Sequence, residues 1–136
     1  MKALVDTSFL YALADRDDRG HQAAVALLTE DVERIVPLPV IPEAAYMIGK
    51  RLGYPAMQQF VHRIAAPSIR LEAITHEDLR RIGAIIDQYA DARFDFVDMA
   101  IMALSERLNI QTVLTFDRRD FQIFRPRHCD RLDIKP

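Results

Sequence analysis

Short apolar runs alternate with amphipathic stretches along the chain. The runs are rich in Val, Ile and Leu, or alternate apolar with polar residues, and each is only a few residues long. This length and composition are typical of strands, most of them buried. The predicted strands are residues 2–6, 35–38, 69–73, 111–115 and, near the end of the chain, 132–134.

Between these runs, apolar residues recur at a spacing of three or four, which predicts helices. Pro42 fits the first turn of one helix because its missing N–H costs nothing there. Thr75 and Asp78 form the pattern of a capping box at the start of another, and Asn109 stands where a left-handed residue ends a helix. The predicted helices are 8–14, 23–28, 42–52, 57–64, 79–89 (apolar stripe Leu79, Ile82, Ile86 and Tyr89) and 96–108.

Strands that alternate with helices predict an α/β sandwich with a mainly parallel sheet of four to five strands. The 136 residues are close to the commonest size of one domain, and the sequence has no internal repeat, linker or low-complexity tract. We therefore expect residues 1–136 to form a single domain.

Composition indicates the class of protein and its cellular compartment, but says little about its function. Half of the residues are hydrophobic and 28% are charged, as is ordinary for a globular protein. The single Cys129 excludes an internal disulfide, and no apolar run approaches the ~20 residues of a membrane span. The apolar stretch before Asp6 is too short for a signal peptide, so we expect a cytoplasmic protein. The net charge of −2 gives no overall basic field of the kind that advertises nucleic-acid binding.

Four acidic residues are placed to converge on one crevice. Asp6 ends the first predicted strand and Asp117 follows the fourth, and sites in parallel sheets form at the carboxyl ends of strands. Glu43 and Asp98 lie near the starts of predicted helices, which in such folds face the same edge of the sheet. A buried carboxylate without a partner is costly, so a core position is a poor explanation for Asp6 or Asp117.

Such a cluster predicts a metal site. Four carboxylates in one crevice repel each other, so without a cation at least one keeps its proton with a raised pKa. The candidate ligands are all oxygens, with no His or Cys at metal-binding spacing, which selects Mg²⁺ or Mn²⁺ over Zn²⁺. Hydrolysis of a phosphodiester bond is the natural reaction for a site of this kind.

Each acid also has a purely structural explanation. Asp6 is suited to cap the helix that begins near Ser8, and Glu43 and Asp98 are favourable first-turn acids. Asp117 is a common type of turn residue. Because all four explanations must then coincide with one crevice by chance, the shared site is the better hypothesis.

Four motifs carry a resemblance to a known family. They are Leu4–Ser8 (Leu-Val-Asp-Thr-Ser), Pro42–Glu43, Asp98–Ala103 (Asp-Met-Ala-Ile-Met-Ala) and Thr115–Phe121 (Thr-Phe-Asp-Arg-Arg-Asp-Phe). Together they span nearly the whole chain, which resembles the PIN-domain ribonucleases and, among them, the VapC-type toxins of toxin–antitoxin pairs. The resemblance implies a three-layer α/β/α sandwich and a metal-dependent endoribonuclease that cleaves RNA.

The resemblance also implies roles for the acids. Asp6 and Asp98 correspond to the principal metal ligands, Glu43 binds the metal directly or through water, and Asp117 completes the cluster. The family implies a cognate antitoxin that inhibits the toxin, and a homodimer. In this sequence the candidate surfaces for the dimer are the Met57–Ile64 stripe and the Leu79–Tyr89 helix.

Several residues have open assignments. Thr7 or Thr115 is expected to hydrogen-bond a ligand or a water. Asp95 is either a further acid of the site or the cap of its helix, and Asp120 either joins Asp117 or pairs with an arginine. The family usually has Gly where Asn109 stands, but Asn also tolerates the left-handed conformation.

Other functions fit the sequence less well. A phosphotransferase of the haloacid-dehalogenase kind needs a second Asp two residues after the first, where this chain has Ser8. A response-regulator receiver needs an acidic pair at that strand and a late Lys, and no late Lys precedes Lys135. Structure-specific DNA nucleases of related fold are larger, and an inactive PIN-like binding module is disfavoured by the full set of four acids.

Overall fold

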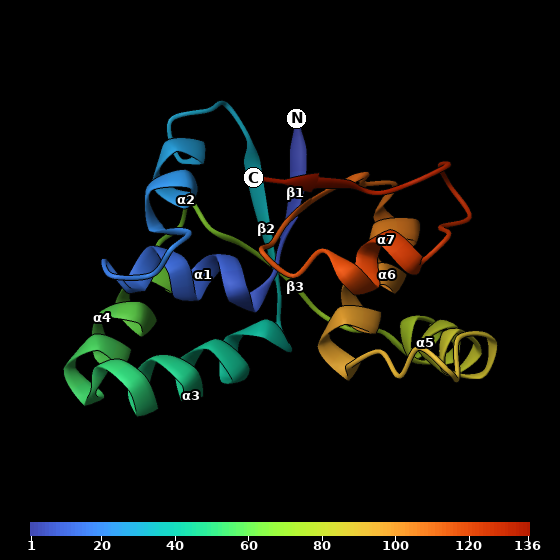
Figure 1. The fold of residues 1–136 in the computed structure, drawn as a ribbon, viewed down its shortest axis with the longest axis horizontal. Helices are drawn as coiled ribbons and strands as arrows, with labels where there is room; N and C mark the ends of the chain where they lie inside the picture. The colour runs from blue at the N-terminus through green and yellow to red at the C-terminus, as the bar shows by residue number, and fades with distance from the viewer.

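A five-stranded sheet, in which every neighbouring pair is parallel, runs through the computed structural model, which describes residues 1–136 (Figure 1). Its strand order is β3-β2-β1-β4-β5. The strands are β1 (Lys2–Val5), β2 (Glu33–Pro37), β3 (Arg70–Glu72), β4 (Thr112–Leu114) and β5 (Asp133–Lys135). All five predicted strands are therefore present, and the sheet is parallel throughout.

Helices cover both faces of this sheet. Figure 1 shows α1 to α4 on one side of the strands and α5 to α7 on the other, which confirms the three-layer architecture. The helices are α1 (Thr7–Ala14), α2 (His21–Leu27), α3 (Val40–Leu52), α4 (Tyr54–Ile64), α5 (His76–Gln88), α6 (Phe96–Leu108) and α7 (Arg119–Ile123). None of them combines the length and hydropathy that a membrane crossing requires.

The order of the strands creates a crevice beside β1. From β1 the chain first moves outward to β2 and β3, and then returns to form β4 and β5 on the other side of β1. The connections that leave β1 and β4 therefore diverge, and in open parallel sheets a ligand site forms at such a point, beyond the carboxyl ends of the strands. Val5 pairs with Leu114 in the register, and the N–H of Asp6 donates to the carbonyl of Leu114 at 3.0 Å. This pairing places Asp6 beside Thr115.

Helix α6 is the central helix of its layer. All eight residues from Asp98 to Ser105 are buried, and most of them belong to the main hydrophobic core with Leu4, Val113 and Phe121. Arg81 of α5 holds the far end of α6 through Glu106, with N–O distances of 2.6 and 3.0 Å. Asp98 is thus carried by a firmly packed element. Asn109 ends this helix in the left-handed conformation, at φ 54°, as predicted.

The capping box of α5 is present, but its apolar stripe is not the predicted one. Thr75 and Asp78 exchange both expected hydrogen bonds, at 2.9 and 3.1 Å. The buried apolar residues of the helix are Ile82 and Ile85, whereas two of the predicted stripe residues, Leu79 (47% exposed) and Ile86 (48% exposed), face outward. Aliphatic residues stand at both 85 and 86, and the sequence pattern alone assigned the wrong one to the core.

Candidate active site

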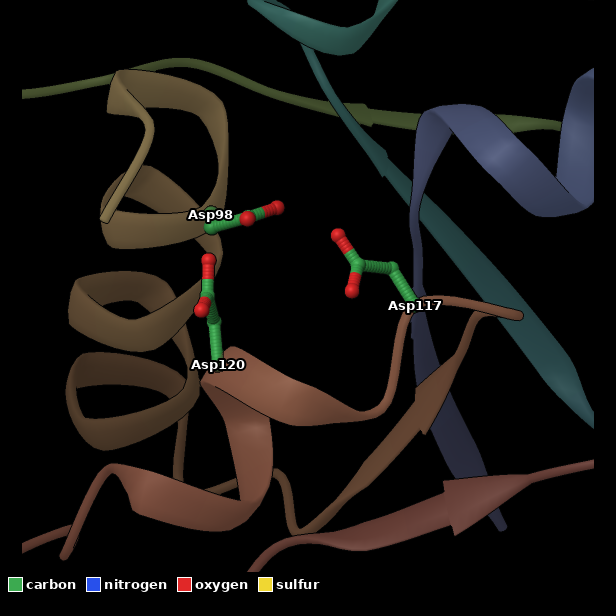
Figure 2. Close-up of side chains that lie close together, drawn as sticks. All are labelled: Asp98, Asp117 and Asp120. Atoms are coloured by element: carbon green, nitrogen blue, oxygen red, sulfur yellow. The ribbon is translucent and has the colours of Figure 1, made fainter. Parts of the chain in front are cut away.

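Three aspartates bring their carboxylates to one point at the carboxyl edge of the sheet. Asp98 comes from the first turn of α6, Asp117 from the segment after β4, and Asp120 from α7. One carboxylate oxygen from each lies within 4.8 Å of the others. Figure 2 shows the side chains of Asp98 and Asp117 pointing toward each other, with Asp120 directed at Asp98 from the side. Asp98 and Asp120 are buried, whereas Asp117 is exposed.

The two remaining predicted acids line the same cleft. This cleft has a volume of about 160 Å³, and its walls include Asp6, Glu43, Asp98 and Asp117. Asp6 is almost fully buried, and Glu43 stands exposed in the first turn of α3. The structure therefore brings together the four acids that the sequence singled out, although only Asp98 and Asp117 belong to the tight group with Asp120.

The assignments that the sequence left open for Asp95 and Asp120 have structural answers. Asp95 occupies the N-cap position of α6 but makes no capping hydrogen bond through its side chain, and it lines the cleft. Asp120 does both things expected of it, because it joins the carboxylate cluster and accepts a hydrogen bond from Arg119 at 2.7 Å. The three-residue spacing from Asp117 was the available signal for Asp120, and α7 itself was not predicted.

Asp6 has two hydrogen bonds that fix its orientation. Its Oδ1 accepts from the N–H of Thr7 at 2.7 Å, so Asp6 is the N-cap of α1, which is the structural role that the sequence offered for it. Its Oδ2 accepts from the hydroxyl of Thr115, also at 2.7 Å. Capping and a place in the cleft are therefore not alternatives for this residue.

The carboxylates are electrostatically unfavourable in the bare protein. Burial, followed by the charges of Asp6 and Asp117 and by the hydrogen bond and charge of Asp120, raises the pKa of Asp98 to about 8. Burial is also the main cause that raises the pKa of Asp6 and that of Asp117. A cation among these groups would relieve the repulsion and favour their ionised forms.

The donor set fits a hard divalent cation. Every candidate ligand in the cleft is an oxygen, which is the preference of Mg²⁺ and Mn²⁺. The hydroxyl oxygen of Thr7 supports this fit: it is buried, it belongs to a residue of the cleft wall, and it has no hydrogen-bond partner. A buried polar atom without a partner is uncommon, and a bound ion or its water would satisfy it.

Known proteins share both the sequence pattern and the fold. The family model described as the PIN domain matches residues 3–125. Ribonuclease VapC26 of Mycobacterium tuberculosis (strain ATCC 25618 / H37Rv) is 28% identical over 134 residues, covering 98% of this chain and 99% of the relative.

Two solved structures extend the comparison to the fold. VapC20 of Mycobacterium tuberculosis, a sarcin-ricin loop cleaving toxin, superposes with a TM-score of 0.79 at 22% identity, covering 85% of this chain and 89% of that one. The second structure is VapBC2 from Rickettsia felis bound to a DNA fragment from the VapBC2 promoter. Its matching chain superposes with a TM-score of 0.72 at 13% identity, covering 99% of this chain and 98% of that one. The family match includes every acid of the cleft. The chain belongs to the PIN domain family.

Proposed function

We propose that this protein is an endoribonuclease dependent on Mg²⁺ or Mn²⁺, that it acts as the toxin of a type II toxin–antitoxin pair, and that a cognate antitoxin inhibits it. The observation that carries the proposal is the cleft in which Asp6, Glu43, Asp98 and Asp117 meet at the carboxyl edge of a PIN-domain sheet. A ribonuclease name on a relative that aligns along nearly the whole chain supports RNA as the substrate. The action belongs in the cytoplasm, where that substrate is found.

Asp6 and Asp98 are the principal ligands in this proposal, with Glu43 and Asp117 completing the set. When bound, the ion would neutralise charge on the scissile phosphate and make a water molecule more nucleophilic. Asp6 is held ready by Thr7 and Thr115, and Asp98 is fixed by the packing of α6. Pre-set ligands of this kind bind metal without first having to be ordered.

The exposed side of the cleft suits an anionic polymer. Asp117 and Glu43 are solvent-exposed, so the metal position is open to a phosphodiester from outside. Arg118 and Arg119 follow Asp117 directly and are also exposed. Arg118 donates to the carbonyl of Pro136 and Arg119 to Asp120, and the other N–H groups of each guanidinium are free to contact neighbouring phosphates. Recognition of this kind does not require an overall basic charge on the domain.

An RNA-cleavage assay tests the proposal. The wild-type chain is expected to cut RNA with Mg²⁺ or Mn²⁺ and to stop in excess EDTA. Asp6→Asn removes a ligand charge while keeping the shape of the side chain, and we expect the rate to fall about 100-fold or more. Asp87→Asn, an exposed position on α5, is the matched control and is expected to cut normally. Wild-type cleavage that persists in EDTA would falsify the metal dependence, and digestion of DNA but not of matched RNA would refute the choice of substrate.

An antitoxin is the proposed partner of the same cleft. The solved VapBC2 complex from Rickettsia felis supports a partner of this kind. We expect the antitoxin to place an Arg or an apolar anchor in the acidic cleft. The proposal predicts that the chain expressed alone arrests bacterial growth and that Asp6→Asn does not. Equal arrest by both would argue against toxicity through cleavage.

We also propose a homodimer, because apolar side chains stand exposed on both surfaces that the sequence suggested. Val61 of α4 is 48% exposed, and Leu79 and Ile86 of α5 are 47% and 48% exposed. Burial of such residues against a second copy would remove apolar area from water. Sedimentation of the purified chain is expected to give a dimer at micromolar concentration, and a monomer well above that concentration would contradict this proposal.

A further inference from the structure

The segment that carries Asp117 is tied to the start of α1 by one serine. The hydroxyl of Ser8 accepts from the backbone N–H of Phe116 at 2.9 Å and lies 3.1 Å from the hydroxyl of Thr115. Thr115 in turn donates to Asp6 at 2.7 Å and accepts from the N–H of Asp117 at 2.9 Å. Ser8 and Thr115 together link the backbone on both sides of the cleft.

The proton positions in this network follow from counting donors. The hydroxyl of Thr115 has a single proton, and it donates that proton to Oδ2 of Asp6. Ser8 must then be the donor in its contact with Thr115. The hydrogen bonds therefore run in one direction, from the N–H of Phe116 through Ser8 and Thr115 to Asp6, and donors arranged in this way polarise one another.

A second anchor holds the same segment through the ring of Phe116. This ring stacks on Phe9 of α1, with centroids 6.4 Å apart and an angle of 13° between the planes. It also occupies the space beside Gly20, where an added Cβ would lie 2.5 Å from Cζ of Phe116. The φ of Gly20 is −88°, which any residue can adopt, so its backbone conformation does not require glycine. What favours glycine here is the lack of a side chain, which leaves room for the Phe116 ring.

We propose that Ser8 is a positioning residue that holds Asp6 and Asp117 in metal-binding geometry, with the Phe116 ring against Gly20 as the second anchor of the same segment. This inference rests on the proposed function, since it concerns ligands of the proposed metal. Partners behind metal ligands orient them, and their loss typically lowers metal affinity 10- to 100-fold. Without the Ser8 hydroxyl, the N–H of Phe116 loses its acceptor, and the hydroxyl of Thr115 loses one of the two donors from which it accepts.

The test compares Ser8→Ala with Ser105→Ala. Ser105 is buried, whereas Ser8 is half-buried, and the Ser105 hydroxyl donates to the carbonyl of Met102 within α6, so its variant controls for the loss of a serine hydroxyl away from the segment. Calorimetric titration with Mn²⁺ alone is expected to give a dissociation constant about tenfold higher in Ser8→Ala and unchanged in Ser105→Ala. Excess Mn²⁺ is expected to restore the cleavage rate of Ser8→Ala, which a general loss of folding would not allow.

Hydrogen exchange supplies a readout independent of metal and cleavage. In Ser8→Ala the amide protons of Phe116 and Asp117 are expected to lose protection, while those of α6 keep it. Gly20→Ala displaces the Phe116 ring without touching Ser8 and is expected to raise the Mn²⁺ dissociation constant in the same direction, which tests the segment if Ser8→Ala folds poorly.

The outcomes separate this inference from the proposed function. An active wild type whose Mn²⁺ affinity and Phe116 protection are unchanged in Ser8→Ala overturns the positioning role alone. A wild type that does not cut RNA, but whose Mn²⁺ affinity falls in Ser8→Ala, contradicts the ribonuclease and keeps the positioning role. A wild type that binds no Mn²⁺ overturns both.

Discussion

Asp98→Asn is expected to abolish RNA cleavage and at the same time to stabilise the metal-free protein. Asp98 is only 5% exposed, and burial together with the neighbouring aspartates raises its pKa to about 8. Above that pH the folded protein must hold a charge that it accommodates poorly. Asn has nearly the same shape and no charge, so the substitution removes the penalty but also a proposed ligand. Loss of activity with gain of stability distinguishes a functional carboxylate from a structural one.

Thermal unfolding in EDTA measures the second half of this prediction. Well above pH 8 we expect Asp98→Asn to be more stable by about 2 kcal/mol, which for a chain of 136 residues is a melting temperature about 7 °C higher. The difference is expected to shrink as the pH falls and to be smallest below about pH 4, where Asp98 is protonated, and so uncharged like Asn, in both the folded and the unfolded protein. Asp87→Asn on the exposed face of α5 is the control for the loss of an Asp charge. A lower melting temperature for Asp98→Asn at high pH would show that the carboxylate stabilises the fold.

The strands and most helices were predictable because their signals are local. Strand β1 is a short apolar run, α5 begins at a capping box formed by Thr75 and Asp78, and α6 ends at Asn109 in the left-handed conformation. Such signals depend on residues a few positions apart. The parallel pairing of the strands then follows from general rules, since strands separated by helices pair in parallel, whereas the strand order comes from the structure.

What the sequence did not predict depends on distant neighbours or on very short elements. Helix α7 has five residues, too few to display a helical period, and so the place of Asp120 stayed open. The choice between Ile85 and Ile86 as core residue depends on how α5 rotates against α6. The hydrogen bond from Thr115 to Asp6 and the contact of Ser8 with Thr115 join residues more than a hundred positions apart. No local pattern indicates such a pair.

For the candidate site, the grouping of the acids was predictable from the sequence but their distances were not. Asp6 and Asp117 follow strands, and the rule that sites lie at the carboxyl ends of strands is enough to place them together from the sequence alone. The register between Val5 and Leu114 supplies the physical reason, because it sets the two following segments side by side. The rule gives no distances, however, and it did not separate the tight group around Asp98 from the more exposed Glu43.

Mn²⁺ is expected to stabilise the protein, and to do so more strongly at about pH 8 than at about pH 6. The pKa of Asp98 is about 8 in the folded protein, against 3.8 for an aspartate free of such surroundings, as in an unfolded chain. The stability that this group contributes without metal is therefore complete below the lower value and is lost as the pH rises toward and through the higher one, by at most about 1.4 kcal/mol per pH unit. Metal binding requires the ionised carboxylate, so at low pH the ion must first displace a proton.

As the pH rises, the metal-free protein loses stability while the stabilisation by Mn²⁺ grows, and these two effects can be measured separately. In EDTA, the melting temperature is expected to fall as the pH rises from about 5 to about 8. With Mn²⁺ at about a hundred times its dissociation constant, the gain is about 2.7 kcal/mol, and the fall should become shallower because the bound ion holds the carboxylates in their charged forms. Calorimetry near neutral pH in buffers of different ionisation enthalpy should detect proton release on binding. Asp98→Asn should release less, because the group that gives up the proton is gone. Mn²⁺ binding that releases no proton in the wild type would mean that Asp98 is already ionised in the metal-free protein, contrary to the electrostatics of the cleft.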